Sequence, residues 1–316
     1  MILHLLNFMV GFILIWLGAG LAIKDIDTLS KKLKFSSFAV SFLFLGFFTS
    51  ISEISVGINS LALGNPEIYV GNLIGSSIVI FLLVIPILAI LGNGLKTVHT
   101  LQKNHLTVIL FTIAAPVFLI FDHTISLADA TIFILLYAYL FQSMHVERGL
   151  RTFLQSFLNF RETAMLRIIG NLAIGIALVL FASHLIVTET IYFAEYLNIA
   201  PFIISLLVIA VGTNIPELSI AVRSLYLGKR EIALGNYLGS ASFNTLLMGA
   251  LTLLNGGSVI LNGNFTLPLL FLVAGLWLFY YYGKSGHRIT RTEGTVLLVI
   301  YIAFVLSEAV KAGLFS

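Results

Sequence analysis

Residues 49–83 read TSISEISVGINSLALGNPEIYVGNLIGSSIVIFLL, and residues 213–247 read TNIPELSIAVRSLYLGKREIALGNYLGSASFNTLL. The two stretches align without a gap at a constant offset of 164, with sixteen of thirty-five positions identical. Chance agreement between apolar helices would match mostly Leu, Ile and Val, whereas these identities include Thr49 with Thr213, Glu53 with Glu217, Gly71-Asn72 with Gly235-Asn236 and Gly75-Ser76 with Gly239-Ser240. The chain therefore contains an internal duplication.

The composition around this duplication is that of a membrane protein. Of the 316 residues, 59% are hydrophobic and 10% are charged, and the mean hydropathy is +1.06. Soluble domains carry about 25% charged residues, so most soluble enzymes and nucleic-acid-binding proteins are excluded. The absence of cysteine excludes disulfides and thiolate metal sites.

Apolar runs long enough for membrane helices recur along the whole chain. A bilayer core of roughly 30 Å needs about 20 apolar helical residues. Such runs fall near 5–23, 38–63, 67–92, 105–121, 125–143, 168–187, 201–227, 231–254, 265–282 and 295–310. The sequence predicts an all-α polytopic membrane protein with ten transmembrane helices.

The basic residues support this number of helices. Alternating the loops between the two sides of the membrane leaves Lys311 alone on one side, and Arg223 lies inside the seventh run, about one turn from its basic end. The other side receives Lys24, Lys31, Lys32, Lys34, Lys96, Lys103, Arg148, Arg151, Arg161, Arg167, Lys229, Arg230, Lys284, Arg288 and Arg291. Because basic loops stay in the cytoplasm, both termini are expected on the outer side, as in a prokaryotic inner membrane protein.

The duplicated unit is expected to contain five helices, since the same offset also pairs Gly11 with Gly175. Five is odd, so the second copy enters the membrane upside down. The predicted organisation is a first repeat over 1–143, a cytoplasmic amphipathic linker over 144–167 and an inverted repeat over 168–316. Inverted repeats characterise secondary transporters, whose sites lie at the midplane between the repeats.

Glu53 and Glu217 are the acidic residues that lie well inside apolar runs. An ionised side chain at a helix centre opposes membrane insertion by roughly 2.5 to 3.5 kcal/mol. A carboxyl group that stays protonated and hydrogen-bonds a neighbouring helix is the structural alternative. Two such residues at equivalent places in inverted repeats favour a cation site.

The residues before each glutamate are polar. Pro216 has no N–H to give the carbonyl of Gly212, so the helix should break there and expose carbonyl groups. The carbonyls of Gly212 and Thr213, the Asn214 amide and the Glu217 carboxylate would form an all-oxygen cluster. Such a cluster suits a hard cation such as Ca²⁺ or Na⁺ rather than a transition metal.

A second polar helix face follows in each repeat. Its members recur at i, i+4 and i+8, which places them on one side of a helix: Asn72, Ser76 and Ile80 in the first copy, and Asn236, Ser240 and Asn244 in the second. The adjacent glycines at 71, 75, 235 and 239 would let a neighbouring helix approach closely. This face is interpreted as the far wall of the site.

At these residues the sequence resembles the calcium/cation antiporter superfamily, and the sodium/calcium exchangers in particular. Its members carry two inverted repeats, each with a G-T-S-x-P-E-like segment followed by G-N-x-x-G-S-N. The resemblance implies one Ca²⁺ shared by Glu53 and Glu217 with the carbonyls of Thr49 and Thr213, and Na⁺ sites that use Ser50, Ser76, Asn214 and Ser240. It also implies that the first and sixth helices slide across the rest to alternate access.

The sequence departs from the family pattern both in the segment before the first glutamate and along the second polar helix face. Phe48 replaces Gly and Ser52 replaces Pro in the first repeat, so a weaker backbone break is expected there, with the Ser52 hydroxyl as a substitute. Ser77 and Ala241 stand where the family usually has Asn. Ile80 and Asn244 occupy positions where Na⁺-driven members often place Asn and Asp, which leaves the number of Na⁺ sites open.

The leading hypothesis is a Ca²⁺ antiporter driven by Na⁺. A Ca²⁺/H⁺ antiporter that uses the same two glutamates is the alternative, followed by a cation channel. Channels are usually symmetric oligomers around a shared pore, whereas this chain supplies both halves of one site, so a monomer is sufficient. No nucleophile–base pair or His-rich motif indicates an enzyme, and no tightly bound cofactor or nucleic acid is expected.

Overall fold

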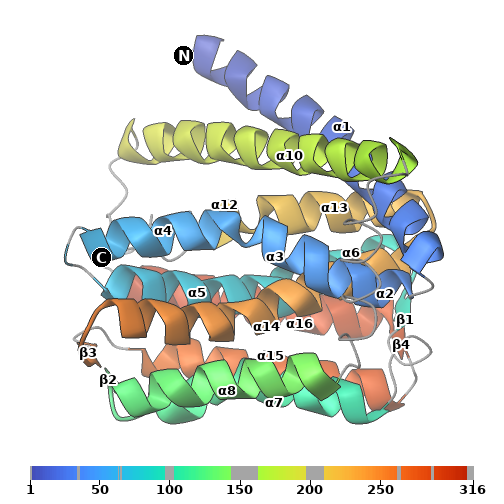
Figure 1. Ribbon diagram of the computed structural model, residues 1–316. Helices are drawn as coiled ribbons and strands as arrows, with labels where there is room; N and C mark the ends of the chain where they lie inside the picture. Colours follow the sequence, from blue (N-terminus) through green and yellow to red (C-terminus); the bar gives the residue numbers. More distant parts are fainter. Residues whose placement is uncertain are drawn as a thin grey trace.

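The computed structural model describes residues 2–33, 36–62, 64, 66–96, 103–143, 163–196, 210–261, 265–285 and 288–311. These residues are almost entirely helical (Figure 1). The first half contains α1 (Ile2–Leu33), α2 (Ser37–Val40), the π-helix η1 (Ser41–Leu45), α3 (Gly46–Thr49), α4 (Ile51–Ala62), α5 (Glu67–Val79), the π-helix η2 (Ile80–Val84), α6 (Ile85–Leu91), β1 (Leu95–Lys96), α7 (Lys103–Leu119), β2 (Thr124–Ile125) and α8 (Leu127–Ser143). The second contains α10 (Thr163–Tyr196), α12 (Ala210–Thr213), α13 (Ile215–Tyr226), α14 (Arg230–Leu254), β3 (Val259–Ile260), α15 (Thr266–Ser285), β4 (Arg288–Ile289) and α16 (Arg291–Lys311).

The helices coincide with the predicted apolar runs wherever the chain is described. Six are long and apolar enough to cross a membrane, over Met9–Leu29, Ser37–Ala62, Glu67–Leu91, Arg230–Leu254, Thr266–Lys284 and Arg291–Lys311. Shorter apolar helices cover His105–Leu119, Leu127–Ser143 and Leu166–Ala182, while the first part of the run at 201–227 lies outside the described residues. The prediction of a helical membrane protein is therefore confirmed.

One predicted helix end is wrong. The segment 24–33, predicted as a basic loop, continues α1, because the Lys31 ammonium pairs with Asp27 one turn earlier at 2.9 Å and Lys229 pairs with the same carboxylate at 2.9 Å. Helix α10 begins at Thr163 and so includes the last residues of the predicted linker 144–167. The rest of this linker lies outside the described residues.

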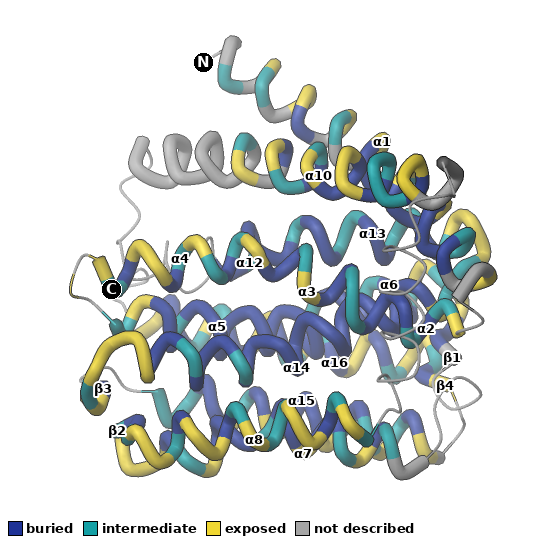
Figure 2. Tube along the Cα trace, viewed as in Figure 1, coloured by how far each residue is buried: buried dark blue, intermediate teal, exposed yellow. Residues whose placement is uncertain are grey.

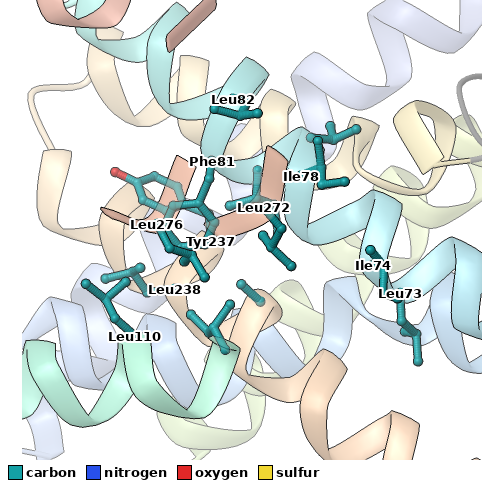
Figure 3. Close-up of a cluster of buried hydrophobic side chains, with 14 of the residues drawn as sticks. Leu73, Ile74, Ile78, Phe81, Leu82, Leu110, Tyr237, Leu238, Leu272 and Leu276 are labelled. Carbon is teal, nitrogen blue, oxygen red and sulfur yellow. The ribbon is translucent and has the colours of Figure 1, made fainter. Parts of the chain in front are cut away.

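The helices form layers that lie roughly parallel to one another (Figure 1). Two helical spans are central: in the most apolar stretch of each span, 83% of the residues are buried in Glu67–Leu91 and 78% in Arg230–Leu254, against 33% in Arg291–Lys311 (Figure 2). Figure 3 shows apolar side chains of this core, including Phe81, Leu110, Tyr237 and Leu272. The two polar helix faces predicted from the sequence thus belong to the most enclosed helices.

A separate apolar cluster joins α1 and α10 to the rest of the molecule. The two helices lie along one face of the molecule (Figure 1). They cross where a Cβ on Gly18 would meet the carbonyl oxygen of Gly175 at 2.6 Å. Their buried side chains, among them Ala22, Ile26 and Leu172, pack with Val40 and Ile220 and form a cluster distinct from the main core.

Close approach between η1, α3 and α14 positions the middle of the molecule. A Cβ on Gly235 would lie 2.8 Å from Cβ of Ser41, and a Cβ on Gly46 would lie 2.7 Å from the carbonyl carbon of Gly239. These contacts confirm the predicted role of the glycines on α14. Gly71 is the first-repeat equivalent of Gly235. The residues that would approach it, 164 positions after Phe38 and Ser41, lie outside the described part of the chain.

Two short antiparallel strand pairs lie at opposite ends of the helices (Figure 1). Strand β1 pairs with β4, and β2 pairs with β3, in the register Leu95 with Ile289, Lys96 with Arg288, Thr124 with Ile260 and Ile125 with Val259. Adding 164 to the numbers of β1 gives β3, and adding 164 to those of β2 gives β4. The two pairs are thus exchanged by the offset found in the sequence.

Candidate cation site

Two helix breaks at equivalent residues form the framework of the site. Ser50, between α3 and α4, has φ −74° and ψ 5°, and Asn214, between α12 and α13, has φ −92° and ψ 2°. The helices resume with the N–H of Ile54 donating to the carbonyl of Ser50 and that of Leu218 donating to Asn214, both at 3.0 Å. The break predicted at Pro216 is confirmed.

The expectation of a weaker break in the first repeat is wrong, because the chain breaks at Ser50 with nearly the same dihedral angles. Ser52 stands where the second repeat has Pro216 and accounts for this without a proline. Its hydroxyl lies 3.0 Å from the carbonyl oxygen of Thr49, within the same turn. Such side-chain bonds compete with the regular backbone ladder of a helix.

Both glutamates are fully buried and meet a serine of the adjacent polar face. Glu53 and Glu217 are each 0% exposed. The Ser76 hydroxyl donates to Oε1 of Glu53 at 3.3 Å, and the Ser240 hydroxyl donates to Oε1 of Glu217 at 2.8 Å. The two bonds join equivalent residues, so the same local arrangement is built twice.

Further polar contacts connect the two halves of the chain. Thr49 donates to Oδ1 of Asn236 at 3.4 Å, and Thr213 reaches Oδ1 of Asn72 at 3.5 Å. The amide of Asn214 donates to Ser76 at 2.8 Å, and the hydroxyls of Ser50 and Ser240 lie 3.2 Å apart. The structure thus brings together all eleven predicted site residues: Thr49, Ser50, Glu53, Asn72, Ser76, Thr213, Asn214, Glu217, Asn236, Ser240 and Asn244.

Several acceptor oxygens in this cluster have no hydrogen-bond donor. They are Oδ1 of Asn214, Oε2 of Glu217 and Oδ1 of Asn244, all buried, and the amide nitrogens of Asn72 and Asn236, which are donors, are likewise buried without a partner. An unpartnered buried acceptor costs about 1 to 3 kcal/mol, so three in one place call for a compensating positive group. A hard cation bound in the cluster would satisfy such oxygen acceptors.

The end of the polar face differs between the two copies, as the sequence indicated. Ile80 is fully buried and has no oxygen to offer. Asn244, its counterpart, donates its amide N–H to Ser76 at 3.2 Å. The first-repeat copy of the polar face therefore ends in a hydrocarbon side chain, and the second-repeat copy ends in an amide.

Glu53 and Glu217 are the acidic members of the cluster. Within the described part of the chain, neither forms an ion pair with a basic side chain. No group of three or more His, Cys, Asp or Glu residues assembles there among the described residues. The donor set consists of carboxylates, hydroxyls, amides and carbonyls, which fits a hard cation.

Three polar residues of interest were not assigned to the site from the sequence. Ser52, whose hydroxyl lies 2.8 Å from Oε2 of Glu53, was considered only as a helix breaker, although its pairing with Pro216 marked it as unusual. Asp25 and Glu308 are also buried carboxyls, 5% and 1% exposed. Asp25 lies within the candidate span Met9–Leu29, and Glu308 lies in the last turn of α16. Lys311 pairs with Glu308 at 3.2 Å, so that carboxylate has its own partner.

A helical membrane protein in which broken helices surround two buried carboxyl groups belongs to the class of ion transporters. The family model described as sodium/calcium exchanger protein matches residues 3–142 and 168–308. The chain therefore belongs to the sodium/calcium exchanger family, which is a family of transporters. This membership is evidence that the chain carries out cation antiport that involves Ca²⁺.

Individual relatives agree with this assignment over nearly the whole chain. The putative antiporter CaxA of Alkalimonas amylolytica is 27% identical, with 94% of this chain and 95% of that protein covered. The sodium/calcium exchanger MaX1 of Methanosarcina acetivorans is 27% identical, with 96% and 97% covered. A structure of the sodium–calcium exchanger NCX_Mj, soaked with Na⁺ and Sr²⁺, superposes with a TM-score of 0.80 at 25% identity, covering 97% of this chain and 98% of that one.

Proposed function

We propose that the protein exchanges Ca²⁺ for Na⁺ by alternating access. In this proposal, ten transmembrane helices form two inverted five-helix repeats, over 1–143 and 168–316, joined by the linker 144–167. The cation binds between the repeats, near the middle of the bilayer, on Glu53 and Glu217. The hydroxyls, amides and carbonyls around them complete its coordination.

One observation carries this proposal: two fully buried carboxyl groups lie in one polar cluster with three unpartnered acceptor oxygens. Ca²⁺ takes six to eight oxygen ligands, a mixture of carboxylates, carbonyls, amides and waters. A cation bound there would satisfy both the negative charge and the unpartnered oxygens. A purely structural pair of carboxyls would leave Oε2 of Glu217 without a partner.

Equivalences at the offset of 164 support the inverted repeats. Adding 164 to the residue numbers maps the strands of one pair onto strands of the other pair. The same offset relates the hydrogen bonds at the start of the last helix of each half. The N–H of Ser126 donates to the Asp129 carboxylate at 2.8 Å, and the N–H of Thr290 donates to Glu293 at 2.7 Å. The family model also matches two segments of nearly equal length that begin 165 residues apart, at 3 and at 168.

Na⁺ is proposed as the driving ion because the named relatives support it. MaX1 is named a sodium/calcium exchanger, and NCX_Mj was soaked with Na⁺ together with Sr²⁺, a divalent ion of the same group as Ca²⁺. Protons are the other candidate, since either glutamate could carry one. The distribution of basic residues supports termini on the outer side of a prokaryotic inner membrane. Both halves of the site come from one chain, so a monomer suffices.

Uptake of ⁴⁵Ca²⁺ into proteoliposomes tests the proposal. Vesicles loaded with Na⁺ and diluted into Na⁺-free medium should accumulate Ca²⁺, whereas an outward proton gradient alone should not drive uptake. Uptake driven only by protons would replace Na⁺ with H⁺ as the coupling ion. Uptake that needs neither gradient and exceeds carrier turnover would indicate a channel.

The residue assignment is tested in the same assay. Glu53→Gln and Glu217→Gln should each abolish exchange, because removal of one carboxylate leaves the bound ion without charge compensation. The matched control is Glu308→Gln, the same change at a buried carboxyl that pairs with Lys311 outside the site. Exchange at the wild-type rate in either site variant would contradict the assignment.

A further inference from the structure

The Ser52 hydroxyl lies at the meeting point of three acceptor oxygens that come from both halves of the chain. Oε2 of Glu53 is 2.8 Å away, the carbonyl oxygen of Thr49 is 3.0 Å away, and the carbonyl oxygen of Thr213 is 3.3 Å away. The first two belong to the broken helix that carries Ser52, and the third belongs to its counterpart.

The hydroxyl cannot satisfy all three acceptors. Serine has one O–H proton to donate, and its two lone pairs are acceptors themselves. At any moment two of the three neighbouring oxygens therefore face the lone-pair side of Ser52. Four oxygens with one hydroxyl proton between them are a set that another positive group close by would stabilise.

Their spacing suits a shared cation. Ca²⁺ binds oxygen at about 2.3 to 2.6 Å, so neighbouring ligands lie about 3.3 to 3.7 Å apart in a six-coordinate shell and closer in larger shells. Of the separations around Ser52, 3.3 Å falls in this range, whereas the 3.0 Å to the Thr49 carbonyl and the 2.8 Å to Oε2 of Glu53 are shorter and would lengthen when a cation binds. Ser52 is also only half-buried, whereas the neighbouring residues Thr49, Glu53 and Thr213 are buried.

We propose that the Ser52 hydroxyl oxygen is itself a ligand of the transported cation, together with the Thr49 and Thr213 carbonyls and the Glu53 carboxylate. This inference rests on the proposed function and adds a ligand that one repeat alone provides. The equivalent residue, Pro216, has no side-chain oxygen to contribute. The coordination is thus asymmetric, and Ser52 is a specificity-determining residue.

Cation binding to the purified protein in Na⁺-free detergent solution tests this role. Ser52→Ala should weaken Ca²⁺ binding about tenfold, the loss typical of one good interaction with a charged group. Ser52→Cys replaces a hard oxygen with a soft sulfur. It should weaken Ca²⁺ binding to a similar degree and strengthen Cd²⁺ binding at least tenfold relative to Ser52→Ala.

A gain in Cd²⁺ affinity separates a ligand from a residue that only orients Glu53, because a positioning role would not respond to the softness of the cation. The matched control is Ser60→Cys on the same helix, where the hydroxyl donates to the carbonyl of Gly57. This variant should bind both ions like the wild type, and the native chain has no other thiol.

The outcomes distinguish this inference from the function on which it rests. Ca²⁺ affinity of Ser52→Ala within twofold of wild type, or no Cd²⁺ gain in Ser52→Cys, would overturn the role of Ser52 alone. Failure of the wild type to bind Ca²⁺, or full binding by Glu217→Gln, would overturn the proposed function. If Ser52→Ala does not elute as a folded monodisperse protein, the role of Ser52 is decided by comparing the Ca²⁺ and Cd²⁺ affinities of Ser52→Cys with those of Ser60→Cys.

Discussion

The charge moved in each cycle of the proposed exchange follows from the groups that line the candidate site. Glu53 and Glu217 carry about −2 together, which one Ca²⁺, two Na⁺ or two protons would balance. The other described members of the cluster are uncharged hydroxyls and amides. A third Na⁺ would need a further ligand set, because a bound charge without a nearby ligand is strongly disfavoured in a site of low dielectric constant.

That further ligand set is depleted at the end of the polar face. Ile80 is buried hydrocarbon, and the amide N–H of Asn244 is directed at Ser76. We therefore expect at most a small net charge per cycle, closer to two monovalent ions per Ca²⁺ than to three. Exchange should then depend little on membrane potential.

The size of the effect makes this measurable. Moving one elementary charge through 100 mV is worth about 2.3 kcal/mol, which would shift the equilibrium Ca²⁺ ratio about 45-fold, since 1.4 kcal/mol corresponds to a factor of ten. Ca²⁺ accumulation is measured in proteoliposomes whose potential is set by valinomycin and K⁺ gradients, at a fixed Na⁺ gradient. The wild type should change by less than about threefold per 100 mV.

A wild-type Ca²⁺ ratio that shifts about 45-fold per 100 mV would refute the charge count. Ile80→Asn provides the complementary test, because it adds an amide oxygen one turn after Ser76 on the same helix face. The variant should become more voltage-dependent. The control Ile80→Val removes one methylene without adding an oxygen and should behave like the wild type once folding is verified.

Two further predictions concern the membrane orientation and the close contact of α14. A single cysteine at Asn255 should react with impermeant reagent from outside intact cells and one at Lys31 should not, because basic loops stay inside; external labelling of Lys31→Cys would reverse the topology. Gly235→Ala should lower the thermal stability in detergent by the equivalent of about 1 to 3 kcal/mol, because its Cβ would overlap that of Ser41. Gly170→Ala, with nothing within 4 Å of its Cβ, is the control, and equal melting temperatures would contradict the contact.

The repeat and the site residues could be predicted because their signal is local. Glu53 and Glu217 stand out as acidic residues in apolar runs, and the spacing of Asn72 and Ser76 places both on one helix face. Pro216 breaks a helix wherever it occurs in an interior. The cluster therefore assembles the residues that the sequence selected.

Other features depend on contacts that spacing does not contain. Hydropathy locates apolar runs but says little about where a helix ends, so the extension of α1 past residue 23, secured by Asp27 and Lys229, was missed. The position of Ser52 beside the Thr213 carbonyl joins residues 161 positions apart. Only the placement of one broken helix against the other brings these atoms together.

Inverted repeats carry an energetic consequence for alternating access. If the two copies were identical, exchanging their conformations would turn the outward-open protein into the inward-open one, and the two states would have equal free energies. Differences between equivalent residues can remove this equality. In the candidate site these include Ser52 opposite Pro216 and Ile80 opposite Asn244. A ligand shifts a conformational equilibrium only through its differential affinity for the two states. If the cation binds to the asymmetric set of ligands proposed above, these ligands also set the side of the membrane that the loaded site prefers to face.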